Sequence, residues 1–233
     1  IMFKFKLDEH EVSNVHFIGI GGISMSGIAA LLLNKGYNVS GSDRSMSDIV
    51  KNLENHGAKI YIGQSKNNIN NPDLVVYTDA ILDDNEELIA ARNLDVPVVS
   101  RGVFLGALMR NYENSIAISG SHGKSTTTSM ISKILLNSKE NPTVLLGGEL
   151  EDLEGNVHVG DEKFLVTEAC EYKGNIRYYY PQTLIVLNID QDHLDYYKNL
   201  DHIVDTFKEY LRNQDENSIT ISNLNEANNR LIF

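Results

Sequence analysis

Residues 115–130, SIAISGSHGKSTTTSM, constrain the fold of this 233-residue chain more than any other segment. The apolar run at residues 116–118 has the β-branched character of a buried parallel strand. It leads directly into residues 120–126, where a helical pattern begins. The segment therefore predicts a strand, a tight loop and the N-terminus of a helix.

The composition of this loop indicates phosphate binding. Its two glycines let backbone N–H groups turn inward, the helix start offers unpaired donors and a positive dipole end, and Lys124 adds a full charge. Ser125 or Thr126 can then hold a magnesium ion. The full P-loop pattern needs glycine where Ile118 stands, so the motif is the shorter G-x-x-G-K-[ST]-[ST], and a glycine-rich turn before a structural helix is the alternative. The predicted phosphate-binding residues are Gly120, Ser121, His122, Gly123, Lys124, Ser125 and Thr126.

Residues 14–110 alternate short apolar runs with helical patterns, as a doubly wound parallel sheet does. The predicted strands are residues 15–18, 38–42, 59–62, 74–77 and 98–100. The predicted helices are residues 23–33, 49–55, 86–92 and 103–110. We therefore expect an α/β protein with a Rossmann-like parallel-sheet domain at residues 1–111 and a P-loop-type α/β domain at residues 112–233, divided at a polar turn.

The first predicted strand ends in a second glycine-rich loop, GIGGISMSG at residues 19–27. The dinucleotide fingerprint G-x-G-x-x-G requires glycine where Ser24 stands, which weakens a nicotinamide interpretation. A diphosphate can still lie on the N–H groups of the helix start, and Asp43 is placed to meet a ribose or base. The alternative is that the glycines only allow close packing and that Asp43 caps a helix. The predicted ligand-binding residues of this loop are Gly19, Gly21, Gly22, Ile23 and Ser24.

Two further residues follow strands whose ends face the same crevice of a doubly wound sheet. Thr78 follows the fourth predicted strand. Arg101 follows the fifth, where its guanidinium can pair bidentately with a phosphate. A solvated arginine at a helix start is the alternative for Arg101.

Two candidate metal ligands follow apolar strands of the second domain. Glu168 ends the strand predicted at residues 164–167, and His193 follows the strand predicted at residues 184–189. An acid at a strand tip beside a phosphate loop can ligate the magnesium that bridges nucleotide phosphates. A solvated carboxylate and an ordinary histidine are the alternatives, but their joint placement favours a site.

Composition excludes several other classes of protein. The formal net charge of -12 argues against a general nucleic-acid or anionic-membrane binder, because either needs a basic surface. Cys170 is the only cysteine, so an internal disulfide and a multi-cysteine metal site are excluded. No apolar run approaches the length of a membrane span, and we expect a cytoplasmic protein. The sequence carries no signature of the oligomeric state.

Four separated motifs resemble those of the ATP-dependent Mur ligases. They are GIGGISMSGIA at residues 19–29, GSHGKST at 120–126, EAxE at 168–171 and NIDQDHLDYY at 188–197. The resemblance runs from about residue 15 to the end of the chain. It implies a UDP-sugar-binding domain followed by a central ATPase domain, with residues 19–24 holding the UDP diphosphate.

The resemblance also implies a reaction of peptidoglycan synthesis. ATP would phosphorylate the lactyl carboxylate of UDP-N-acetylmuramate, and the amine of L-alanine would attack the acyl phosphate to form an amide. Carried over by motif, Lys124 would neutralise charge on the transferring γ-phosphoryl group, and His122 would lie beside the substrate. Ser125 and Glu168 would hold one Mg2+, and His193 a second near the substrate carboxylate.

The family resemblance implies a third, C-terminal domain and more of the central domain than this chain contains. We therefore expect an incomplete ATPase domain and a fragment that is inactive alone. Within the family, the murein tripeptide ligase of cell-wall recycling and the folate and cyanophycin ligases are alternatives, and GGISMSGIA favours the branch that adds L-alanine. A non-catalytic nucleotide-sugar binding module and a nicotinamide oxidoreductase are alternatives from other classes.

Overall fold

The computed structural model describes residues 3–7, 12–150, 155–191 and 196–233. The chain divides into two compact units, Lys6–Phe104 and Leu105–Phe233, and residues 3–5 belong to the second. We call them the N-terminal unit and the C-terminal unit. Each contains one sheet with helices, so the predicted α/β class, a Rossmann-like parallel sheet followed by a second α/β sheet, is confirmed.

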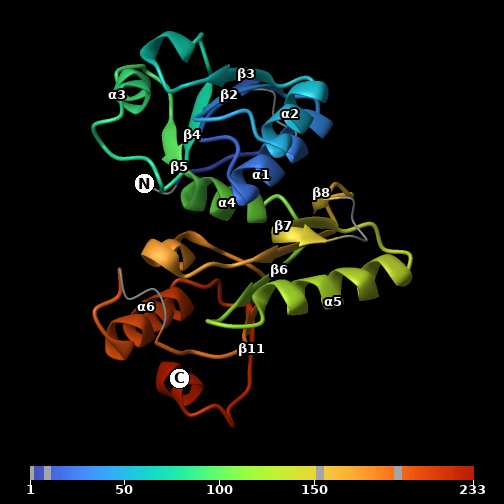
Figure 1. Ribbon diagram of the computed structural model, residues 1–233. Coiled ribbons are helices and arrows are strands. Elements are labelled where there is room, and N and C mark those ends of the chain that lie inside the picture. Colours follow the sequence, from blue (N-terminus) through green and yellow to red (C-terminus); the bar gives the residue numbers. More distant parts are fainter. Residues whose placement is uncertain (1–2, 8–11, 151–154, 192–195) are drawn as a thin grey trace. The chain divides into compact units, whose positions relative to one another are not determined.

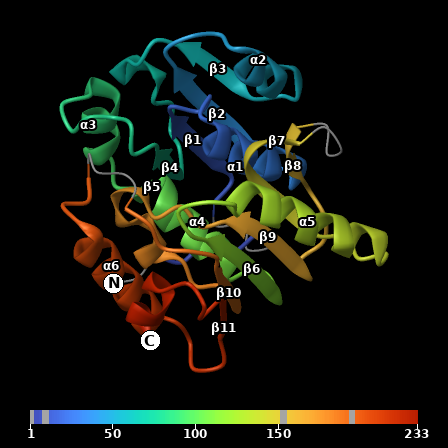
Figure 2. The same cartoon turned by 60° about the horizontal axis from the view of Figure 1, so that its bottom comes forward.

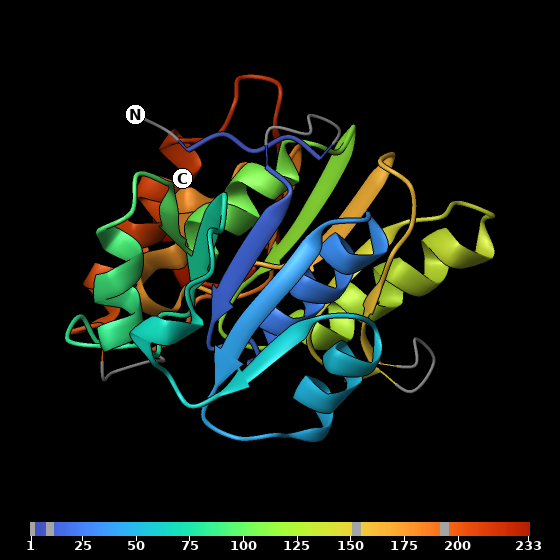
Figure 3. The same cartoon turned by 90° about the horizontal axis from the view of Figure 1, so that it is seen from above.

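The sheet of the N-terminal unit has five parallel strands in the order β3-β2-β1-β4-β5. These strands are β1 (Asn14–Ile18), β2 (Asn38–Asp43), β3 (Lys59–Ile62), β4 (Leu74–Tyr77) and β5 (Val98–Ser100). The helices are α1 (Ile23–Asn34), α2 (Asp48–Asn55), η1 (Lys66–Asn68), α3 (Glu86–Arg92) and α4 (Arg101–Met109), the last of which continues into the C-terminal unit. Helices α1 and α2 cover one face of the sheet and α3 the other (Figures 1 and 3). The strand order reverses between β1 and β4, and ligands of doubly wound sheets bind at such a switch point.

Burial explains why these residues form strands and helices. Strand β1 is buried from Val15 to Ile18 without alternation, as expected of a parallel strand covered on both faces. Leu88 and Ala91 of α3 pack on Ile18 and Val75 of the sheet. Helix α3 begins at Asn85, whose side-chain oxygen accepts hydrogen bonds from two N–H groups of the first turn.

The sheet of the C-terminal unit has six strands in the order β11-β10-β6-β9-β7-β8, and only β8 is antiparallel to its neighbour. These strands are β6 (Asn114–Ser119), β7 (Thr143–Leu150), β8 (Gly155–His158), β9 (Phe164–Glu168), β10 (Thr183–Val186) and β11 (Ile219–Ser222). The helices are α5 (Lys124–Asn137), η3 (Tyr172–Tyr178), α6 (Leu200–Arg212) and η4 (Asn228–Ile232). Figure 2 shows α5 beside β6 and β9, and Ile131 and Leu135 of this helix pack on the buried apolar side chains of the sheet.

Most predicted elements of the N-terminal unit agree with the structure within one residue, and two boundaries elsewhere or at its end differ by more. Strand β10 ends at Val186 instead of Ile189, because the next residues bond to the loop after β6. Helix α4 begins at Arg101 instead of Val103, because the Ser100 hydroxyl accepts the N–H of Val103 and starts the helix earlier. Among the described residues, no helix has the length and apolar character needed to cross a membrane.

Candidate functional site

The glycine loop of the N-terminal unit connects β1 to α1 and leaves no room for a side chain at Gly19 or Gly21. Gly19 has a φ of +83°, and a Cβ atom there would lie 2.5 Å from Cγ2 of Thr78. A Cβ on Gly21 would lie 2.8 Å from Oδ2 of Asp43, which accepts the Gly21 N–H at 2.8 Å. Asp43 therefore lies under the loop and holds it in place.

The N-terminus of α1 is open to a ligand. Its N-cap residue is Gly22, and no described side chain caps the helix. Arg101 reaches this end from the start of α4, with Nη1 3.4 Å from the hydroxyl of Ser24 and Nη2 3.9 Å from Asp79. The structure thus brings together Ser24 and Arg101, which are far apart in the sequence, and directs a positive charge toward a helix start that itself favours anions.

A cavity of about 230 Å³ lies at the end of these strands. Its lining includes four predicted residues, Gly19, Gly22, Asp43 and Thr78. The residues that sequence reasoning missed are Arg44, Gln64 and Ile81. Arg44 and Gln64 lie in the loops just after the second and third predicted strands, and Ile81 lies in the loop after the fourth, so position near the carboxyl edge of the sheet was the available signal.

Gln64 is held at the cavity by a buried network. Its side-chain oxygen accepts a hydrogen bond from Asn85 at 2.7 Å. The neighbouring Ser65 donates its N–H to the carboxylate of Glu87, which lies 2.7 Å from Nε2 of His16. Glu87 and His16 are 0% and 1% exposed, so this pair ties the loop after β3 to β1 and α3.

The phosphate loop of the C-terminal unit connects β6 to α5. Gly120 has a φ of +135°, and a Cβ atom there would lie 2.9 Å from the carbonyl oxygen of Asn188. Gly123 is the N-cap of α5 in the left-handed region, and no described side chain caps this helix. The first turn of α5 therefore presents N–H groups without intrahelical acceptors, which is the predicted anion-binding geometry.

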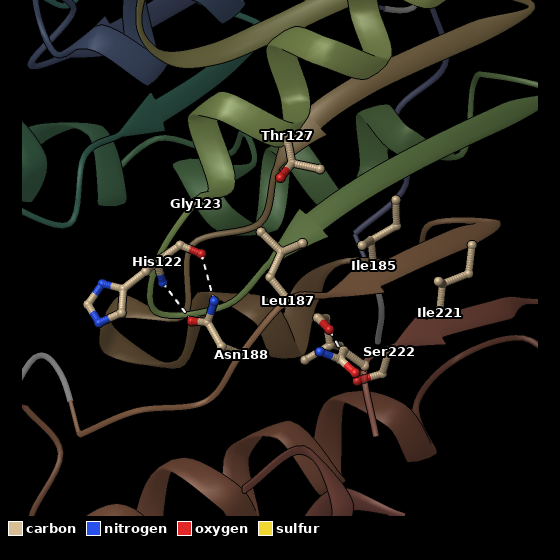
Figure 4. A pocket seen from close by; sticks show the side chains of 10 residues that line it. His122, Gly123, Thr127, Ile185, Leu187, Asn188, Ile221 and Ser222 are labelled. Atoms are coloured by element: carbon tan, nitrogen blue, oxygen red, sulfur yellow. Dashed lines mark hydrogen bonds between the residues drawn. The ribbon is translucent and has the colours of Figure 1, made fainter. Parts of the chain in front are cut away.

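The segment after β10 holds this loop from one side. Ser121 donates its N–H to the carbonyl of Asn188, and its hydroxyl accepts the N–H of Asp190 at 2.9 Å. The side chain of Asn188 bonds both the N–H and the carbonyl of His122, at 2.8 and 3.0 Å (Figure 4). The imidazole of His122 is 68% exposed and lies 3.6 Å from Asp190. Sequence reasoning did not single out Asn188, although it opens the NIDQDHLDYY motif.

Lys124 folds back into its own loop. Its ammonium group donates to the carbonyl oxygens of Gly120 and Ser121 and lies 3.4 Å from Oε2 of Glu171. Glu171 is 2% exposed, and its carbonyl accepts the hydroxyl of Tyr197. Burial is the main cause that raises the pKa of the Tyr197 phenol, which therefore stays protonated as a donor. The last position of the EAxE motif is thus a buried counter-charge of Lys124.

The described residues are suited to Mg2+ only when phosphate supplies further oxygens. Glu168 lies at the end of β9, paired with β6 beside Ile118, and its Oε1 accepts the N–H of Gly147 at 2.9 Å. The predicted ligand Ser125 lies exposed in the first turn of α5. Within the described part of the chain, no group of three His, Cys, Asp or Glu side chains could hold a metal ion, and His193 lies outside it. A hydroxyl and one carboxylate match Mg2+, which takes few protein oxygens and completes its shell with phosphate and water.

A second cavity, of about 570 Å³, lies beside the phosphate loop (Figure 4). Its apolar lining comes from Ile185, Leu187 and Ile221, and its polar lining includes His122 and Asn188. Such mixed lining is typical of sites that bind flat organic groups.

The two folds and their loops are typical of α/β nucleotide-binding proteins. Residues 14–113 match the Mur ligase family, catalytic domain, and residues 118–232 match the Mur ligase middle domain. The chain belongs to the Mur ligase family, and the predicted resemblance is confirmed.

The similar proteins include two named UDP-N-acetylmuramate–L-alanine ligases. That of Alkaliphilus metalliredigens is 47% identical over 231 residues, which are 99% of this chain and 50% of the relative. That of Clostridium perfringens is 52% identical over 198 residues, which are 85% of this chain and 43% of the relative. The chain thus spans about half the length of the curated relatives it matches.

Solved structures of the same family share the fold. UDP-N-acetylmuramate-alanine ligase MurC of Thermotoga maritima has a TM-score of 0.83 at 32% identity, covering 94% of this chain and 51% of that protein. The UDP-N-acetylmuramate:L-alanyl-gamma-D-glutamyl-meso-diaminopimelate ligase of Neisseria meningitides has a TM-score of 0.86 at 25% identity, covering 95% of this chain and 74% of that chain.

Proposed function

We propose that this chain is the UDP-sugar-binding and partial ATP-binding portion of a ligase that joins L-alanine to UDP-N-acetylmuramate. The observation that carries the proposal is the pair of uncapped helix starts, α1 after a glycine loop and α5 after a lysine-bearing loop, in the chain order of the family. The names of the relatives, at about half identity to this chain, support the choice of L-alanine.

In this proposal, the domain at residues 1–111 holds the UDP-sugar. The diphosphate lies on the N–H groups at the start of α1, and Arg101 neutralises part of its charge. Asp43 keeps the glycine loop in shape through Oδ2, accepts the N–H of Arg44 through Oδ1, and lines the cavity. The proposed contacts of the UDP-sugar are Gly19, Gly21, Gly22, Ile23, Ser24, Asp43, Thr78 and Arg101.

The domain at residues 112–233 holds ATP in the same proposal. In the first step, a lactyl carboxylate oxygen attacks the γ-phosphorus of ATP, ADP leaves, and an acyl phosphate forms. In the second step, the alanine nitrogen attacks the acyl carbon, phosphate leaves with the bonding electrons, and the nitrogen loses a proton. Lys124 stabilises the charge that moves onto the leaving oxygen. Ser125, Glu168 and His193 would hold Mg2+, which supplies charge neutralisation of the phosphates. His122, whose imidazole is exposed at the loop, is the proposed substrate contact of this domain.

A murein tripeptide ligase is the second candidate, and the fold similarity to the Neisseria meningitides protein favours it specifically. The two candidates share the UDP-sugar and differ in the amine that attacks. Phosphate release that depends on L-alanine, compared with release that depends on the tripeptide, separates them in a protein that carries every domain of the family. A chain that binds the UDP-sugar but supports neither reaction is the non-catalytic module.

Calorimetric titration of the 233-residue chain with UDP-N-acetylmuramate tests the first site. We expect one saturable site, weakened about tenfold in Arg101→Ala by loss of charge-assisted hydrogen bonds. Arg230→Ala is the matched control, because this exposed arginine lies in the C-terminal unit. Equal or tighter binding of NADH overturns the proposal in favour of an oxidoreductase.

A further inference from the structure

The backbone of the phosphate loop is oriented by one residue, Asn188, which lies in the segment after β10. Asn188 follows β10, 66 residues from His122 in sequence, and its amide bonds both backbone polar groups of His122. The backbone carbonyl of Asn188 accepts a third hydrogen bond, from the N–H of Ser121. The same carbonyl occupies the space that a Cβ atom on Gly120 would need. Three consecutive loop residues are therefore held against Asn188.

These bonds determine where the other groups of the same peptides point. In a trans peptide the carbonyl and the next N–H point in opposite directions, and the structure has no cis peptide among its described residues. Because the N–H groups of Ser121 and His122 point to Asn188, the carbonyls of Gly120 and Ser121 point away from it. Both of these carbonyls accept hydrogen bonds from Lys124, which confirms their direction.

The last peptide of the loop has the reverse orientation. The carbonyl of His122 points to Asn188, so the N–H of Gly123 points to the opposite side, where the ammonium of Lys124 lies. This N–H continues the row of first-turn N–H groups of α5. The N–H groups of Ser121 and His122 thus donate to Asn188, whereas the N–H of Gly123 points to the side where a ligand can bind.

We propose that Asn188 is the positioning residue of the phosphate loop. It directs the N–H of Gly123 toward bound phosphate, and it orients the two carbonyls that hold the ammonium group of Lys124. The donors to phosphate are then Gly123 and the first turn of α5, while Ser121 and His122 donate none. This inference rests on the proposed ATP site and adds the residue that shapes it.

Two substitutions and one control test this role in the 233-residue chain. Asn188→Asp can still accept the His122 N–H but cannot donate to its carbonyl, whereas Asn188→Ala loses both bonds. Asn228→Ala is the matched control, because Asn228 donates at 2.7 Å to the carbonyl of Ile189 in the same segment and does not bond the loop. Calorimetry with magnesium tripolyphosphate should give about tenfold weaker binding for both Asn188 variants and unchanged binding for the control.

Amide NMR of the wild-type chain tests the same inference without any variant. On addition of magnesium tripolyphosphate, the amide resonances of Gly123, Lys124 and Ser125 should shift, while those of Ser121 and His122 should remain in place. Wild-type affinity in both Asn188 variants, or a dominant shift of the His122 amide, overturns the role of Asn188 alone. Absence of binding by the wild-type chain overturns the proposed ATP site and this inference with it.

Discussion

At the scale of single residues, the ammonium of Lys124 is the group around which the phosphate loop is arranged. Two carbonyl oxygens and the buried carboxylate of Glu171 surround it. A buried carboxylate near a phosphate site opposes anion binding through like-charge repulsion, yet it also holds the lysine in place. Glu171 and Lys124 therefore act as a pair with opposite effects on an incoming phosphate.

Lys124→Ala should abolish most turnover in a family member that contains this chain and all other domains. The loss should be about 10²- to 10³-fold in kcat, because the lysine acts mainly on charge that develops in the transition state. UDP-N-acetylmuramate binding should stay within about twofold, since the substitution lies in the other unit. Steady-state kinetics measures the loss in kcat, and calorimetry measures the affinity for UDP-N-acetylmuramate. Near wild-type turnover would remove the phosphate loop from the mechanism.

The two acids of the EAxE motif should respond oppositely to loss of charge. Glu171→Gln should bind magnesium tripolyphosphate about tenfold more tightly, because the carboxylate that competes for Lys124 is gone, and should lower the thermal midpoint by leaving the lysine without its counter-charge. Glu168→Gln should weaken the same binding, and only when magnesium is present. Parallel titrations with and without magnesium give the answer; equal effects of the two substitutions would contradict the assignment.

At the scale of elements, helix caps separate structural helices from candidate binding helices. The N-cap residues of α2, α3 and α6 are Ser47, Asn85 and Asn199, whose side chains accept N–H groups of the first turn. The N-cap residues of α1 and α5 are Gly22 and Gly123, and no described side chain caps either helix. The two helices that follow glycine loops thus start without a side-chain cap from the described residues, which is the arrangement of anion-binding helix N-termini.

The free energy of unfolding should depend on pH because of a hydrogen-bonded carboxylate, that of Asp73, at the start of the central strands. Asp73, just before β4, accepts the N–H groups of Ser13 and Asn14 at the start of β1, and these bonds lower its pKa below the ordinary value of 3.8. Because the folded pKa is the lower one, its stabilising contribution is complete above pH 3.8 and is lost as pH falls through the folded pKa.

Urea denaturation of the wild-type chain and Asp73→Asn over a pH series measures this contribution. The variant should be less stable near neutral pH, and the difference in unfolding free energy should shrink as the pH falls below about 3.8. A difference that stays constant down to acid pH would show that the aspartate acts without its charge.

At the scale of the whole molecule, the chain carries two sheets with separate ligand loops. It spans half the length of its Alkaliphilus metalliredigens relative. In the proposed reaction the amine must be held in line with the acyl phosphate, and orientation of this kind can contribute about 7–11 kcal/mol.

The 233 residues should therefore bind the UDP-sugar but form no amide product. Phosphate release in the presence of ATP, magnesium and UDP-N-acetylmuramate should not increase when L-alanine is added. Reactions without UDP-N-acetylmuramate measure background ATP hydrolysis. Sustained release that depends on L-alanine would mean that this chain contains all the groups that the reaction needs.

Local signals in the sequence determined most elements and both loops. The bounds of β3, β4, β5 and α3 were predicted to the residue, because short apolar runs and helical spacing are set by near neighbours in the chain. The two glycine loops were recognisable because backbone approach to phosphate needs glycine at a strand end.

The sequence predicted that Arg101 faces the crevice of the first loop, but only the tertiary structure decided which side chains bond to each other at the two loops. Arg101 reaches Ser24 across 77 residues, and Asn188 reaches His122 across 66. Strand β10 ended three residues early for the same reason, since its last predicted residues bond to the phosphate loop. Such contacts depend on which strands are neighbours in the sheet, and the order β10-β6-β9 is a consequence of packing the whole unit, which local periodicity does not encode.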